Sequence, residues 1–120
     1  MSDYRKLDIY HRARALSTRV HHLVKALPRA EQFRRGDQLI RSANSIRNNI
    51  VEGSTAGSPV HVAKYLRTSI GSADELQDQI LALSDVELLP SEFRDLLSEP
   101  SEVAAMIVSY RKTVLSDGHK

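Results

Sequence analysis

The sequence predicts an all-α protein folded as an antiparallel up-down-up-down four-helix bundle, with the fourth helix kinked or broken near Pro100. Three observations support this prediction. Four segments place apolar residues alternately four and three positions apart, which is the spacing of one helix face. Short connections with proline or glycine separate the segments, and this favours helices that reverse direction in turn. No segment competes with these as a strand.

The composition is that of one globular domain. A chain of 120 residues can form one hydrophobic core, so we expect a single domain over residues 1–120, ordered from about 7 to 115 and frayed at 116–120. The 41% of apolar and 27% of charged residues differ clearly from disordered compositions. With no membrane-spanning stretch, no signal peptide and no cysteine, the expected location is the cytoplasm.

The first expected helix covers about residues 7–27 and ends before Pro28, because proline disfavours helical geometry in the preceding residue and has no amide hydrogen. The second covers about residues 34–53. Its small residues, such as Gly36, favour close approach of another helix. We expect Gly53 to end it in a left-handed conformation, which glycine adopts without steric cost.

The third expected helix begins with Ser58 as its N-cap and Pro59 at its first position, and it continues to about Leu83. Three further apolar residues are expected to widen its buried face: Tyr65, Ile70 and Leu81. Apolar faces this broad exceed the needs of a small monomer. They favour self-association.

The fourth expected helix opens with Ser91 as its cap. Pro100 lies on the apolar face of this helix. We therefore expect the helix to kink there, or to end and a new helix to begin, with Ser98 or Glu99 at the junction.

No pattern indicates an active site, and we expect a non-enzyme with no cofactor, no metal and no small-molecule substrate. The five histidines include no pair three or four residues apart, as helical metal ligands would be. His11 and His22 share a face but are separated by roughly 16 Å of helix. The glycines form no phosphate-binding loop, and no serine occupies a nucleophile elbow.

Basic residues are concentrated in the first half of the chain. Residues 1–67 carry 13 Lys and Arg against 5 Asp and Glu, whereas residues 68–120 carry 4 against 10. Helical spacing relates several of the arginines, which we predict to form a basic wall between the first two helices: Arg5, Arg12, Arg19, Arg34, Arg35, Arg41 and Arg47. Such a wall would bind nucleic acid by charge and shape.

Structured RNA or duplex is the predicted ligand, because most aromatic side chains lie on or beside apolar stripes and are not free to stack on bases. The alternative interpretation is a scaffold whose arginines pair with acids of a neighbouring helix or subunit. Asp74, Glu75 and Asp78 are the candidate partners in that case.

Two motifs carry a family resemblance: Asn-Ile-x-Glu-Gly at residues 49–53 and Leu-Arg-x-x-x-Gly-Ser-x-x-Glu-Leu at 66–76. Together with residues 4–16, they resemble the four-helix-bundle proteins encoded by intervening sequences in bacterial 23S ribosomal RNA genes. The motif residues transferred to this chain are Gln38, Arg41, Asn49, Glu52, Gly53, Arg67, Gly71 and Glu75.

The resemblance implies a homopentameric ring and kinship with the accessory proteins of diversity-generating retroelements, whose basic surface binds nucleic acid. It implies no catalytic role for any motif residue. We interpret them as structural, and expect Asn49 and Glu52 to bond neighbouring backbone or Arg67. This chain has Arg47 where the family commonly has proline, so we expect a straighter second helix.

Overall fold

The computed structural model describes residues 3–117, and these residues are helical apart from short connections and caps. This confirms the predicted all-α fold class for the described range. Three short elements have other helical geometry: η1 and η3 are 3-10 helices, and η2 is a π-helix. In chain order the elements are η1 (Tyr4–Lys6), α1 (Asp8–Ala26), α2 (Arg29–Glu31), η2 (Gln32–Gly36), α3 (Asp37–Ser54), α4 (Pro59–Asp85), η3 (Ser91–Leu97) and α5 (Glu99–Asp117).

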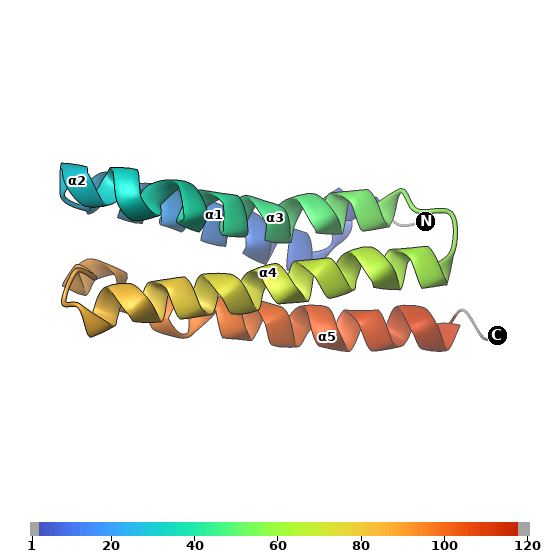
Figure 1. Cartoon of the computed structure of the whole chain (residues 1–120). Coiled ribbons are helices and arrows are strands. Elements are labelled where there is room, and N and C mark those ends of the chain that lie inside the picture. The colour runs from blue at the N-terminus through green and yellow to red at the C-terminus, as the bar shows by residue number, and fades with distance from the viewer. Residues whose placement is uncertain (1–2, 118–120) are drawn as a thin grey trace.

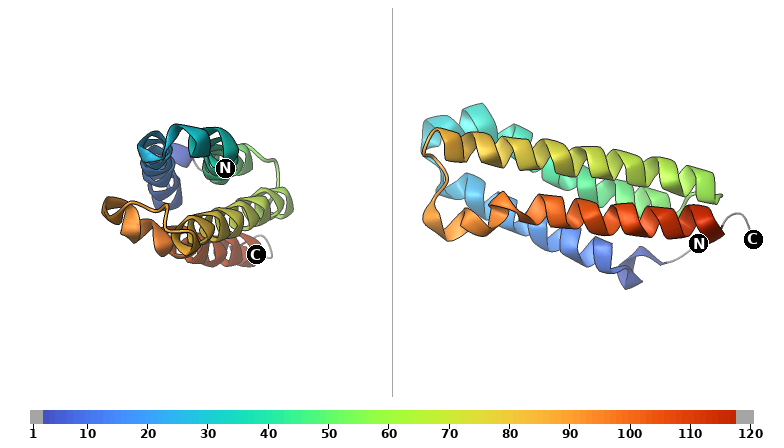
Figure 2. Two further views of the ribbon diagram at one scale, coloured as in Figure 1. Left: turned by 60° about the vertical axis from the view of Figure 1, so that its left-hand side comes forward. Right: turned by 90° about the horizontal axis from the view of Figure 1, so that it is seen from below.

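The four long helices form an elongated bundle in which each reverses the direction of the one before (Figure 1). Helix α1 packs on α3, α3 on α4, and α4 on α5, while α5 meets α1 over a smaller area to close the bundle (Figure 2). Both α1 and α4 therefore touch α3 and α5, and they lie diagonally opposite each other. The outward faces of α1 and α4 point in opposite directions.

The core consists of the apolar residues that the four-and-three spacing identified. Its largest side chains are less than 2% exposed, and burying each leucine or isoleucine stabilises the fold by roughly 1.5–3 kcal/mol. They include Leu16 and Leu23 in α1, and Leu76 and Ile80 in α4. The prediction that Tyr65 and Leu81 widen the buried face is wrong, because these side chains are 37% and 47% exposed on the outside of α4.

The second long helix begins earlier and ends later than predicted. Helix α2, the π-helix η2 and α3 follow one another without a break from Arg29 to Ser54. Helix α3 continues through Arg47 without a break. The π-helix presents Phe33 to solvent, with its side chain 81% exposed. The extra residue that a π-turn inserts is not visible in a periodicity of apolar positions.

The prediction that Gly53 forms a left-handed stop is also wrong. No glycine among residues 3–117 has a positive φ, and Gly53 lies within α3. A Cβ atom at this position would lie 3.3 Å from the Cβ of Tyr65 and 3.6 Å from the carbonyl oxygen of Val62. Glycine is therefore needed here because α3 and α4 approach closely, and not because the helix ends.

The start of α4 is confirmed. The Ser58 hydroxyl accepts a hydrogen bond from the backbone amide of His61 at 3.3 Å, and Pro59 occupies the first helical position.

Ser91, by contrast, is not a cap, because Pro90 precedes the helix and Ser91 is the first residue of η3.

The predicted fresh start near Pro100 is confirmed. Ser98 ends η3, and Glu99 begins α5, so that Pro100 falls in the first turn, where no intrahelical amide bond is lost. Helix α5 continues to Asp117, so fraying is contradicted for residues 116 and 117. The rest of the predicted tail, residues 118–120, lies outside the described range.

Helix α4 ends in a Schellman motif. The Leu88 amide donates to the Leu83 carbonyl at 2.8 Å, and the Glu87 amide donates to the Ser84 carbonyl at 3.0 Å. Glu87 has a φ of 60°, the position that glycine usually occupies in this motif. A Cβ atom in left-handed geometry crowds the following carbonyl oxygen, so this residue is strained.

Replacing Glu87 with glycine should relieve this strain. We expect Glu87→Gly to raise the free energy of unfolding by about 0.5–1 kcal/mol, measured by urea denaturation. The matched control is Glu87→Ala, which removes the same charge but keeps the Cβ atom. An equal gain from both variants would show that the charge, and not the backbone conformation, destabilises this end of α4.

Candidate nucleic-acid interface

Two of the predicted arginines join α1 to the C-terminal part of the chain. Arg12 donates through Nε and Nη2 to Oε1 of Glu99, at 3.0 and 2.7 Å. Arg19 bonds the carboxylate of Asp95, and its guanidinium lies 4.9 Å from the centre of the Phe93 ring. These contacts cross the seam between α1 and the η3–α5 segment. They hold the bundle closed, so these arginines are not free for a ligand.

Arg47 is also used inside the molecule. Its Nη2 donates to the Tyr10 hydroxyl at 3.2 Å, and its guanidinium lies 5.5 Å from the centre of that ring. This contact joins α3 to α1.

The other predicted arginines pair with nearby carboxylates in the sequence. Arg35 donates to Glu31 at 2.9 Å, and Arg41 forms an ion pair with Asp37 at 3.1 Å. Arg34 approaches the same Glu31 at 3.9 Å. The side chains of Arg34 and Arg41 are 75% and 78% exposed, and exposed pairs of this kind contribute little to stability.

Arg5 forms a local pair with Asp3 at 2.9 Å. The side-chain hydrogen bond from Arg5 lowers the pKa of the Asp3 carboxyl and raises the pKa of Arg5. The seven arginines therefore do not form one free basic wall. The carboxylates proposed as partners from the sequence, at positions 74, 75 and 78, take part in none of these pairs.

The residues of the family motifs are spread over α3 and α4. Asn49 donates to the Ser45 carbonyl at 2.8 Å, as expected, whereas Glu52 and Arg67 make no ion pair within residues 3–117. Gln38 lines a crevice of about 210 Å³ between the two helices. Gly71 and Glu75 are exposed on α4.

The outward face of α1 carries basic residues that the sequence reasoning did not select. Exposed side chains recur along it at His11, Arg14, Thr18, His22 and Lys25. No Asp or Glu occurs between positions 9 and 30. The side chains of Arg14 and Lys25 make no ion pair with any described residue. The sequence does contain a signal for this surface. It is the stretch without acidic residues, whose basic residues lie on the helix face opposite the apolar stripe.

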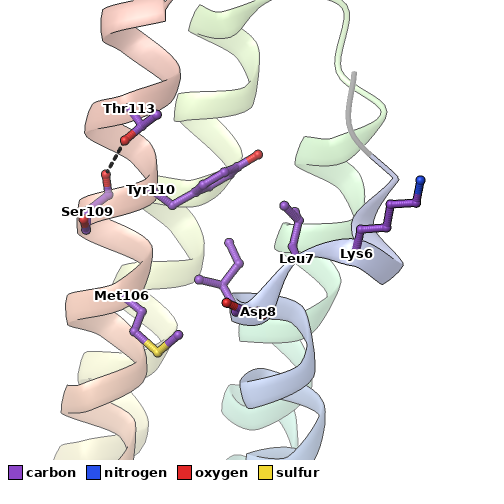
Figure 3. A pocket seen from close by; sticks show the side chains of 8 residues that line it. Lys6, Leu7, Asp8, Met106, Ser109, Tyr110 and Thr113 are labelled. Carbon is purple, nitrogen blue, oxygen red and sulfur yellow. Dashed lines mark hydrogen bonds between the residues drawn. The ribbon is translucent and has the colours of Figure 1, made fainter.

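A groove of about 500 Å³ opens between the start of α1 and the second half of α5 (Figure 3). Leu7, Ile9, Met106 and Tyr110 give it a largely apolar lining. Lys6 extends away from Tyr110 (Figure 3). Lys6 and Asp8 are the charged residues of the lining. The groove marks the end of the seam at which α1 and α5 separate.

Comparison with known families identifies the chain. Residues 5–109 match the family model described as 23S rRNA-intervening sequence protein. The chain belongs to this family. No curated protein matches the chain.

Among residues 3–117 of this intervening-sequence family member, no helix is both long and apolar enough to cross a bilayer. Within the same range, no group of three His, Cys, Asp or Glu residues is placed to hold a metal ion.

The contact between Arg12 and Glu99 should be energetically coupled. In a double-mutant cycle with alanine at both positions, we expect a coupling energy of about 1 kcal/mol, because the charged hydrogen bonds are half-buried and join distant segments. The same cycle on Arg41 and Asp37 should give at most about 0.5 kcal/mol, since both side chains are exposed on one helix. Urea denaturation measures both. Equal coupling in the two cycles would contradict a closing role for Arg12.

Proposed function

We propose that this chain is a non-catalytic bundle of the cytoplasm that binds structured RNA or duplex through the outward face of α1. The observation that carries the proposal is the acid-free basic surface formed by Arg14, Lys25, His11 and His22. Arg14 and Lys25 are eleven positions apart, roughly 16 Å along a helix axis. Cations at this spacing on a rigid element can contact separate phosphates and orient the protein on a backbone.

The predicted arginines differ in whether the bundle needs their ion pairs. Phosphate binding by Arg12 or Arg19 would break bonds that close the bundle, so we exclude both from the proposed surface. Arg5, Arg34 and Arg41 are more than 70% exposed and are held only by local carboxylates. Exchanging such a weak pair for a phosphate costs little, so these three can extend the surface.

A scaffold is the second candidate function. It is favoured by the finding that all seven predicted arginines bond within the chain. In either case we propose a homo-oligomer, and the family resemblance implies a pentamer.

Charge reversal on α1 tests nucleic-acid binding. We expect Arg14→Glu/Lys25→Glu to weaken binding to an RNA hairpin at least about tenfold and to lower the slope of log affinity against log salt by about 2. Fluorescence anisotropy over a salt series measures both quantities.

The control is Arg94→Glu/Lys112→Glu, which makes the same change in net charge on exposed residues of η3 and α5. It should change the affinity by less than about threefold, as expected for non-local electrostatics alone. If both double variants weaken binding equally, or if the wild-type protein binds independently of salt, the α1 surface is not the binding site. The scaffold function would then be preferred.

A further inference from the structure

Phe33 is the most exposed aromatic residue of the described chain. Its side chain is 81% exposed, whereas the other Phe and Tyr residues among 3–117 are at most 37% exposed. It adds little to the core, because hydrophobic stabilisation requires that apolar surface is removed from water. Phe33 lies in the π-helix η2, and π-turns inside helices frequently occur at functional sites. The packing of the bundle therefore does not explain an aromatic residue at this position.

A groove of about 350 Å³ lies beside Phe33. Val24 and Ile40 contribute apolar side chains to its lining, and Gly36 contributes bare backbone. A Cβ atom at Gly36 would lie 2.8 Å from Cγ1 of Val24, so glycine allows the end of α1 to pack directly on η2. The volume falls in the range of small-ligand sites, roughly 300–1,000 Å³. The ring and the groove together offer a largely apolar surface to a flat group.

The surroundings of this groove are basic. Residues 24–41 carry five Lys and Arg against two Asp and Glu. Lys25 and Arg29 are exposed and make no ion pair with any described residue. Both acids, Glu31 and Asp37, are paired with arginines. An exposed aromatic ring among cations is typical of sites for unpaired nucleic-acid strands, in which the cations contact phosphates and the ring stacks on bases.

Hydrogen bonds hold the groove at one end of the basic surface of α1. The side-chain amide of Gln32 donates to the Leu27 carbonyl at 2.8 Å and to the Lys25 carbonyl at 3.3 Å. These two carbonyls belong to the last turn and the C-cap of α1. Lys25, the last cation of the proposed surface, is thereby fixed next to the element that carries Phe33. The groove is therefore continuous with that surface.

We propose that Phe33 and its groove bind an unpaired base of the RNA whose helical stem lies on the outward face of α1. The inference rests on the proposed function, in which Arg14 and Lys25 contact the phosphates of the stem. The unpaired base stacks on the Phe33 ring, and Arg29 contacts the phosphates that follow the stem. Most aromatic side chains were expected to be unavailable for stacking, and Phe33 is the exception. The ligand is thus an RNA stem followed by an unpaired segment, and not a continuous duplex.

Two RNAs with the same stem test this inference, one with a single-stranded overhang and one with blunt ends. We expect the wild-type protein to bind the overhang RNA at least about fivefold more tightly, as base stacking on an aromatic ring allows. Phe33→Leu should remove this preference, because leucine is apolar but cannot stack. It should leave the slope of log affinity against log salt unchanged, since no charge is lost. Fluorescence anisotropy over a salt series measures each quantity.

Two further variants separate stacking from other effects. Phe33→Trp should keep the preference for the overhang RNA, because an indole ring also stacks on bases. Tyr65→Leu removes an aromatic ring from the outside of α4 and should keep it as well. The melting temperature of Phe33→Leu should stay within about 3 °C of the wild-type value, because an exposed side chain contributes little to stability. Unfolding is then excluded as the cause of a lost preference.

A wild-type protein that binds both RNAs equally would overturn the inference, and so would equal weakening of both RNAs by Phe33→Leu. If Arg14→Glu/Lys25→Glu still weakens binding of the blunt stem in these cases, the proposed function stands without a base site at Phe33. A wild-type protein that binds neither RNA overturns both. If Phe33→Leu lowers the mass in light scattering, the groove is covered by another copy of the chain, and an RNA base is not its occupant.

Discussion

Closure of the bundle between α1 and α5 is the constraint on which the rest of the structure depends. The other three seams join long helices that follow one another in the chain, so short connections hold them in place. The fourth seam brings together residues 76 and 87 positions apart, through Arg19 with Asp95 and Arg12 with Glu99. The contact between α1 and α5 is the smallest of the four helix–helix contacts. Charged hydrogen bonds therefore supply much of what holds this seam together.

This closure determines which cations remain for other molecules. Arginines on the shoulders of the apolar stripe, such as Arg12, turn toward neighbouring segments, while residues on the opposite side of α1, such as Arg14, face solvent. The middle of α4 is exposed as well, and the charged residues on both sides of Gly71 make no ion pair within residues 3–117. Because α1 and α4 are diagonal, the outward face of α1 and the exposed face of α4 lie on opposite sides of the bundle.

Local signals predicted the helix boundaries that depend on a few neighbouring residues. Pro28 and the Ser58-Pro59 pair act through their own backbone geometry, and both boundaries are confirmed. Gly53 was misassigned because its role depends on how closely α4 approaches, which no local pattern contains. The exposure of Phe33 could not be predicted either. Phe33 lies in the π-helix, and the one extra residue of a π-turn leaves no signal in the spacing of apolar residues.

The sequence by itself determined the helical fold class, because the spacing of apolar residues requires one buried face on each segment. It also determined the excess of arginine in the first half of the chain. Only the tertiary structure decided which arginines are free. An ion pair such as Arg12 with Glu99 depends on the distance between residues far apart in the chain, and that distance exists only after the helices have packed.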